Sequence, residues 1–151
     1  MGGPEYDFEL GTDGPSLMVV GVDGSRTSMR AAAYAAGLAR RQGCRILVLY
    51  VGHIGAGASL SPGAAAAMTE AASQTAAELE AEVVNGAARA GIAAEFRAVA
   101  GDPFTELTRV ATQERADAVV VGTSEHAGHR IVGSLATRLV RSGKWPVIVV
   151  P

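Results

Sequence analysis

The chain contains a single cysteine, Cys44, and no long uninterrupted apolar run. One cysteine cannot form an internal disulfide, which excludes a small secreted scaffold held together by such bonds. The apolar runs are shorter than the ~20 residues that a membrane-spanning helix needs. The first residues also lack the basic and apolar regions of a signal peptide. We therefore expect a cytoplasmic protein that makes no contact with a membrane.

An excess of positive charge is also missing, because 13 Lys and Arg residues stand against 15 Asp and Glu residues. A nucleic-acid-binding domain usually carries a basic patch, so no nucleic acid partner is predicted. Apolar residues, in contrast, make up 48% of the 151 residues. A chain of this size and composition can bury a substantial hydrophobic core.

The first sixteen residues differ from the rest of the chain. They contain four acidic residues among glycines and prolines and show no apolar period. Residues 1–16 are therefore predicted to be a flexible acidic tail. No linker, repeat or change of composition interrupts residues 17–151, which we expect to form one domain.

Short apolar runs alternate with helical segments throughout this domain. The predicted strands are residues 17–22, 45–51, 93–100, 118–121 and 147–150. The predicted helices run from a cap at Ser25 or Thr27 to Gln42, and over residues 64–90, 103–115 and 134–142. Alternating strands and helices are typical of a parallel sheet with right-handed crossovers. The sequence thus predicts an open, doubly wound α/β fold with helices on both faces of the sheet.

Ligands of such sheets bind beyond the carboxyl ends of the strands. The loop after the first strand offers Asp23, which could hold an amino or hydroxyl group or could simply form a turn. The loop after the fourth strand runs from Gly122 to Ser134, with Gly133 and Ser134 at the start of a helix. Free N–H groups at a helix start can bind an anion, although Ser134 could equally serve as a helix cap.

The order of these motifs resembles the universal stress protein family over roughly residues 17–151. The motifs are V-D-G-S after the first strand, G-D-P before a helix, V-V-V-G-T, a glycine-containing loop to G-S, and W-P-V-I-V-V at the C-terminus. The resemblance implies a five-stranded parallel sheet in the order 3-2-1-4-5 and a homodimer. It also implies a regulatory role in the stress response and, as in many members of the family, ATP binding.

The resemblance also assigns site residues. In ATP-binding members, an aspartate after the first strand and a valine that ends the second hold the adenine. The motif G-x2-G-x9-G-S/T holds the ribose and the phosphates. The matching residues here are Asp23, Val51, Gly122, Gly133 and Ser134. Their neighbours Val22, Thr123, Gly128 and Leu135 complete the predicted set for ATP or another adenine nucleotide.

The chain departs from this motif in two ways. Glu125 stands where the second glycine is expected, and ten residues instead of twelve separate Gly122 from Gly133. A carboxylate at this position would repel the phosphates, although two histidines and an arginine in the same loop could donate hydrogen bonds to them. The sequence therefore predicts weaker nucleotide binding than in relatives with the complete motif.

Two alternatives to nucleotide binding stay open. A dimeric scaffold without nucleotide is favoured by Glu125 and by the short loop. A slow ATP hydrolase or autophosphorylating protein would use Ser134 as the acceptor. No spacing typical of a hydrolase is present, so the sequence does not commit the chain to being an enzyme. Glu125, His126 and His129 lack a clear fourth ligand, so we predict no metal site.

The C-terminal strand, residues 147–150, is expected to lie at an edge of the sheet. An exposed apolar edge strand favours pairing with another chain, and two identical chains would pair symmetrically. The sequence thus predicts a homodimer formed through this strand.

Overall fold

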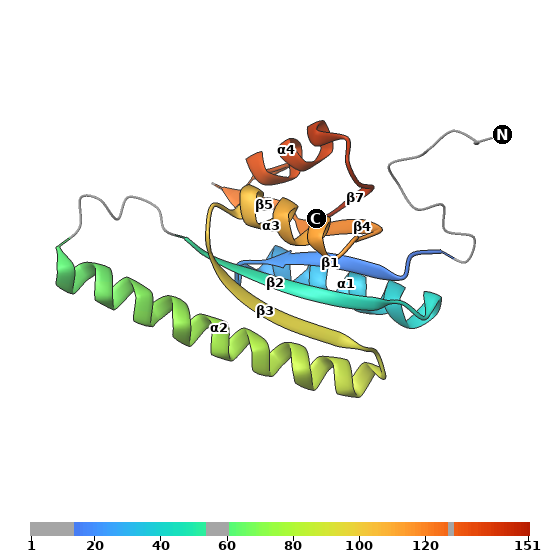
Figure 1. The fold of residues 1–151 in the computed structure, drawn as a ribbon, viewed down its shortest axis with the longest axis horizontal. Coiled ribbons are helices and arrows are strands. Elements are labelled where there is room, and N and C mark those ends of the chain that lie inside the picture. Colours follow the sequence, from blue (N-terminus) through green and yellow to red (C-terminus); the bar gives the residue numbers. More distant parts are fainter. Residues whose placement is uncertain (1–13, 54–60, 127–128) are drawn as a thin grey trace.

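The computed structural model describes residues 14–53, 61–126 and 129–151. Within these residues, five parallel strands form one sheet in the order β3-β2-β1-β4-β7 (Figure 1). The strands are β1 (Leu17–Val22), β2 (Arg45–His53), β3 (Ala94–Gly101), β4 (Ala118–Gly122) and β7 (Val147–Val150). The helices are α1 (Arg26–Gln42), α2 (Pro62–Ala90), α3 (Pro103–Gln113) and α4 (Ser134–Ser142). The predicted α/β fold and the strand order 3-2-1-4-5 are both confirmed.

Each central strand is apolar on both faces because helices cover both sides of the sheet. Side chains of odd-numbered residues, such as Val19 and Val119, pack towards α3 and α4. Side chains of even-numbered residues, such as Val20 and Val120, pack towards α1 and α2. These four valines are completely buried. The two packed layers place the ends of the strands, and therefore the loops, at the two open edges of the sheet.

The helices begin where their capping residues predict. Ser25 is the cap of α1, and its hydroxyl accepts a hydrogen bond from the Ser28 N–H at 3.3 Å. Asp102 caps α3 by accepting from the Thr105 N–H at 2.9 Å, with Pro103 as the first helical residue. Such caps satisfy N–H groups that have no partner within the helix. Three helices, α1, α2 and α4, end at a glycine in the left-handed conformation, as expected.

Helix α2 is unusual because so little of it is buried. It has 29 residues, two more at its start than predicted, and Leu79 is its single fully buried residue. The first turns of the helix project beyond the sheet (Figure 1). Alanine-rich sequence favours the helical state without support from packing, and only the second half of α2 packs on the sheet.

The segment between β4 and α4 differs from the loop that the sequence predicts. Two short strands, β5 (Ser124–His126) and β6 (His129–Ile131), pair antiparallel, with Ser124 opposite Ile131 and Glu125 opposite Arg130. Strands of three residues are too short to show an alternating pattern. In such a ladder the backbone groups bond across the hairpin, so fewer of them stay free for a ligand.

The start of β1 is held by one carboxylate. Asp117 Oδ2 accepts hydrogen bonds from the Ser16 N–H at 2.7 Å, the Ser16 hydroxyl at 2.9 Å and the Leu17 N–H at 3.0 Å. Partial burial raises the pKa of Asp117 and is the largest single effect, but the three hydrogen bonds together outweigh it. The pKa of Asp117 therefore lies below its ordinary value.

Replacing Asp117 with asparagine is expected to lower the free energy of unfolding by about 1 kcal/mol at neutral pH, because a charged acceptor is lost. Since the folded-state pKa is lowered, the contribution of the carboxylate is fully present above the unfolded value of about 3.9. It is lost as the pH falls through the folded-state pKa. Urea unfolding at pH 7 and pH 3 measures this difference.

Glu70→Gln is the control, because it removes a carboxylate from an exposed position of α2. We expect no effect of this control on stability at either pH. A difference between wild type and Asp117→Asn that persists unchanged at pH 3 would contradict the role of the charge.

Candidate functional site

Three chain segments meet at the carboxyl ends of the central strands. Asp23 follows β1, the segment from Gly122 to Ser124 ends β4 and begins β5, and Gly133 precedes α4. Gly122 lies against the first turn of α1, and Gly133 lies against Ser124. The fold therefore brings together parts of the sequence that are about a hundred residues apart, as the position of the predicted site requires.

Asp23 presents an exposed carboxylate at this edge. Its Oδ1 accepts a hydrogen bond from the Ser25 N–H at 2.8 Å, which fixes the turn that precedes α1. Partial burial raises the pKa of Asp23 and is the largest single effect, but hydrogen bonds from Ser25 and Ser28 together lower the pKa below its usual value. The side chain is therefore an anionic acceptor at neutral pH, suited to an amino or hydroxyl group.

Gly122 is required by the packing of α1. A Cβ atom at this position would lie 2.5 Å from the carbonyl carbon of Thr27 and 2.7 Å from the Ser28 nitrogen. The Thr27 hydroxyl donates to the Thr123 carbonyl oxygen at 2.6 Å and ties the same two segments together. The first glycine of the predicted motif thus has a role in the fold that does not depend on any ligand.

The start of α4 is an open helix end. Gly133 is the N-cap and provides no side-chain acceptor. A Cβ there would lie 2.9 Å from Ser124 Cβ, so glycine is also needed for packing. Ser134 is the exposed first helical residue and does not cap the helix. The interpretation of Ser134 as a cap is therefore wrong, and the first N–H groups of α4 receive no capping side chain, as in an anion site.

Thr123 lies between these parts of the site. Its Oγ1 is buried and has no hydrogen-bond partner among the described residues. Buried polar atoms are almost always paired with protein or with an ordered molecule. This hydroxyl is therefore an unused donor and acceptor within the candidate site.

The remaining predicted residues contribute in other ways. Val22 is buried in the core on the α1 side of the sheet, so its side chain cannot contact a ligand. Val51 and Leu135 are partly buried and pack on the core beneath α3 and α4. Gly128 lies outside the described residues. The structure does not describe the side chain of Glu125, whose backbone lies in β5.

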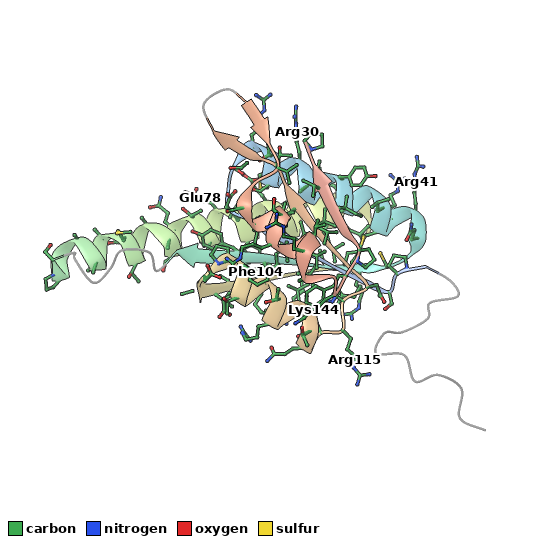
Figure 2. All side chains as sticks on the ribbon, turned by 90° about the horizontal axis from the view of Figure 1, so that it is seen from above. Arg30, Arg41, Glu78, Phe104, Arg115 and Lys144 are labelled. Atoms are coloured by element: carbon green, nitrogen blue, oxygen red, sulfur yellow. The ribbon has the colours of Figure 1, made fainter. Side chains whose placement is uncertain are left out.

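The sequence analysis missed a cation on the same edge. The Arg138 guanidinium lies 4.1 Å from the centre of the Phe104 ring and 3.8 Å from Asp102 Oδ2. Phe104 belongs to α3 and is labelled in Figure 2. Arg138 follows Ser134 by four residues, which places both on the same face of α4; this spacing was the available signal. The structure therefore adds a positive charge near the open end of α4.

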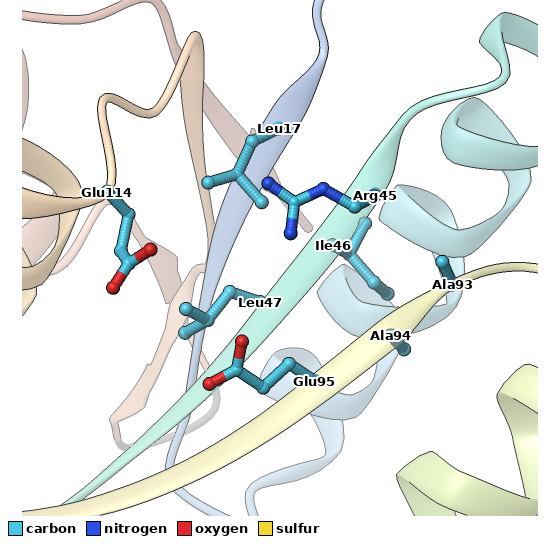
Figure 3. A pocket seen from close by; sticks show the side chains of 8 residues that line it. All are labelled: Leu17, Arg45, Ile46, Leu47, Ala93, Ala94, Glu95 and Glu114. Carbon is cyan, nitrogen blue, oxygen red and sulfur yellow. The ribbon is translucent and has the colours of Figure 1, made fainter.

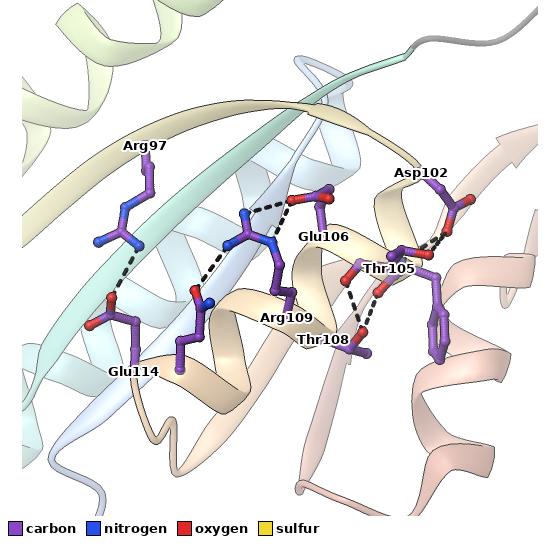
Figure 4. A network of polar contacts seen from close by, with 9 residues as sticks. Arg97, Asp102, Thr105, Glu106, Thr108, Arg109 and Glu114 are labelled. Carbon is purple, nitrogen blue, oxygen red and sulfur yellow. Dashed lines mark hydrogen bonds and ion pairs between the residues drawn. The ribbon is translucent and has the colours of Figure 1, made fainter.

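Other polar side chains serve the fold. Arg109 donates to Glu106 at 2.6 Å and to Gln113 at 2.9 Å along the surface of α3 (Figure 4). Arg97 of β3 pairs with Glu114 at 3.1 Å and with Glu95 at 2.6 Å. These pairs are partly exposed, and such pairs contribute little to stability.

A hollow of about 230 Å³ lies at the opposite edge of the sheet, by the amino ends of the strands. Arg45, Glu95 and Glu114 point into its surroundings (Figure 3). Both glutamates already bind Arg97. The hollow is small, and its carboxylates are in use, so the carboxyl edge remains the better candidate site.

Within the described residues, no three His, Cys, Asp or Glu side chains are grouped so that they could hold a metal ion. The described helices include none with the length and apolar character needed to cross a membrane.

The fold and the site can be compared with known proteins. The model of the universal stress protein family matches residues 17–151. The universal stress protein MJ0531 of Methanocaldococcus jannaschii is 26% identical over 136 residues, which cover 88% of this chain and 80% of that protein.

Solved structures agree with this match. The universal stress protein UspA of Lactobacillus plantarum superposes with a TM-score of 0.77 at 22% identity, covering 90% of this chain and 97% of that one. A universal stress protein in complex with cAMP superposes with a TM-score of 0.67 at 25% identity, covering 91% and 97%. Because the family model spans nearly the whole chain and the observed fold agrees with it, this chain belongs to the universal stress protein family.

Proposed function

We propose that this protein is a cytoplasmic regulator of the stress response that binds an adenine nucleotide at the carboxyl edge of its sheet. The observation that carries the proposal is the buried hydroxyl of Thr123, which has no partner among the described residues. It lies next to an anionic acceptor, Asp23, and to the open end of α4. A relative of similar fold is known in complex with cAMP, which supports an adenine nucleotide as the ligand.

Each part of the site has a task in this proposal. Asp23 accepts a hydrogen bond from the exocyclic amino group of the adenine, and Val51 borders the base. The N–H groups at the start of α4, beginning with Ser134, bind a phosphate through their positive end. Thr123 donates a hydrogen bond to the ribose or to the first phosphate. Arg138 adds positive charge on the same face of α4 as Ser134.

Replacing Asp23 with alanine is expected to weaken the binding of ATP, AMP and cAMP by about the same factor, roughly tenfold, since one charged hydrogen bond contributes about 1.5 kcal/mol. The equal effect follows because the residue acts at the base, which these ligands share. Calorimetric titration of each nucleotide measures the three dissociation constants.

Glu80→Ala, which removes an exposed carboxylate from α2, is the control and should leave the three constants unchanged. Wild-type protein that shows no heat of binding with any adenine nucleotide at millimolar concentration would rule out the proposed function.

A dimeric scaffold is the second candidate, and one feature of the sheet favours it. Strand β7 pairs with β4 on one side only, within the described residues. The carbonyl groups of Pro146 and Val150 accept hydrogen bonds from the β4 segment. Successive residues of a strand point their backbone groups to opposite sides, so Val147 and Val149 point theirs to the free edge. A second copy could pair there.

Replacing Val149 with proline is expected to shift the protein towards the monomer, because proline removes an N–H group from the free edge. Sedimentation velocity at low and high micromolar concentration measures this shift, and circular dichroism checks that the variant is folded. Ile148→Pro is a poorer variant, since Ile148 points its backbone towards β4. Wild-type protein that sediments as a monomer at high micromolar concentration would contradict the dimer.

A further inference from the structure

A second hollow lies far from the candidate nucleotide site. It is a groove of about 700 Å³ between α1 and α2. Small residues form its walls, among them Ala36 and Gly37 of α1 and Gly86 and Ala90 of α2, and Ile46 of β2 contributes to its floor. Because these residues have short side chains, the helices do not close over the sheet here, and the described residues leave the groove uncovered.

One end of the groove is basic. Arg40 lies in the last turn of α1, and Arg89 lies in the last turn of α2. Both side chains are exposed and line the groove. No described residue forms an ion pair or a hydrogen bond with either guanidinium. Glu82 is about 10 Å away from Arg89 along the axis of α2, towards the other end of the groove. The groove therefore combines an apolar interior with two unpaired positive charges at one end.

The N-terminal segment of the chain begins at this basic end. Helices that follow parallel strands run back towards the amino ends of those strands, so α1 ends near the start of β1. A Cβ atom on Gly14 would lie 3.4 Å from Gln42 Oε1, at the C-terminal end of α1. Figure 2 shows Arg41 at the same end of this helix. Residues 1–13 thus precede a point next to Arg40.

The sequence of this segment complements the groove. Residues 5–10 read E-Y-D-F-E-L, so acidic and apolar side chains alternate. In an extended chain these two kinds of side chain point to opposite sides. An extended stretch of this length spans about 17 Å. The groove wall from Met29 to Arg40 of α1 is also about 16 Å long. Four residues, up to about 13 Å of chain, connect Leu10 to Gly14.

We propose that residues 5–10 occupy the groove between α1 and α2 of their own chain. Tyr6, Phe8 and Leu10 enter the apolar interior, and the intervening carboxylates lie beside Arg40 and Arg89. Each aromatic side chain that is buried removes about 150–250 Å² from water, which gives the segment a reason to dock. The core of residues 17–151 is complete without it, so the segment covers a surface of the domain and is not needed for folding.

The test uses the full chain with a nitroxide spin label on Gly3→Cys. Cys44 does not compete for the label, because it is buried and burial raises the pKa of its thiol. The label broadens the amide signals of nearby residues in an NMR spectrum. We expect at least a two-fold loss of intensity at Ala36 and Gly86, and no loss at Ala111 and Leu139 on the other face of the sheet.

Charge-reversed variants test the complementarity. Arg40→Glu with Arg89→Glu should abolish the broadening, and adding Asp7→Lys with Glu9→Lys should restore it. Arg26→Glu with Arg115→Glu, which reverses two exposed arginines outside the groove, should leave it unchanged.

Two results would overturn the proposal. One is broadening that is spread evenly over the surface or concentrated on another face. The other is broadening that appears on an isotope-labelled chain when the spin label is carried only by a second, unlabelled chain. That result would make the groove a contact between copies.

Discussion

Replacing Gly122 with alanine is expected to destabilise the protein by about 3 kcal/mol, which would lower its melting temperature by about 6–12 °C. The new Cβ would lie 2.5 Å and 2.6 Å from the carbonyl carbon and oxygen of Thr27. These are backbone atoms of the first turn of α1, so no side-chain rotation can relieve the overlap. The variant can fold only if α1 moves away from β4, which disrupts the Thr27–Thr123 hydrogen bond as well.

Gly63→Ala is the matched control, since no atom lies within 4 Å of a Cβ at that position of α2. It is expected to change stability by less than about 1 kcal/mol. Thermal unfolding without nucleotide compares the two variants. Equal melting temperatures for wild type and Gly122→Ala would show that this glycine is conserved in the motif pattern for ligand contact and not for the packing of α1.

Replacing Glu125 with glycine is expected to strengthen ATP binding by one to three powers of ten. A carboxylate about 4 Å from a phosphate costs about 1–4 kcal/mol at effective dielectric constants between those of water and a protein surface. AMP should gain less than ATP, because the repulsion acts mainly on the outer phosphates. Calorimetric titration of both nucleotides provides the comparison, and it is meaningful only where wild-type protein binds nucleotide at all.

Glu125→Gln separates charge from bulk, because it keeps the side-chain length and removes the charge. If charge limits affinity, glutamine should recover most of the gain seen with glycine. If neither variant changes ATP affinity, the limit is the hairpin. Its strands β5 and β6 pair with each other, and the loop is two residues shorter than the motif requires.

Most of the fold could be predicted from the sequence, for physical reasons that are visible in particular residues. The apolar run at residues 17–22 is buried on both sides, so its strand could be recognised without a partner. The capping signals at Ser25 and Asp102 placed the starts of α1 and α3 correctly. Strand order, in contrast, depends on which helix crosses which face, and it came from the family resemblance.

The details of the candidate site were less accessible. The hairpin of β5 and β6 is too short to show a period, and its pairing depends on where the flanking elements hold it. The role of Gly122 depends on Thr27, which lies 95 positions earlier in the chain. No local pattern reports such an approach. The stacking of Arg138 on Phe104 likewise joins two helices that only the folded sheet brings together.

The long exposed helix α2 has a consequence for how the molecule opens. Its first turns project past the sheet and bury no side chain fully (Figure 1), so little free energy holds them against unwinding. Amide protons there should exchange with solvent through local opening, long before those of β1 and β4, which exchange only when the whole domain unfolds. The same turns are the first place where a protease could cut within the described helices. This chain is thus a rigid sheet joined to a helical arm of much lower local stability.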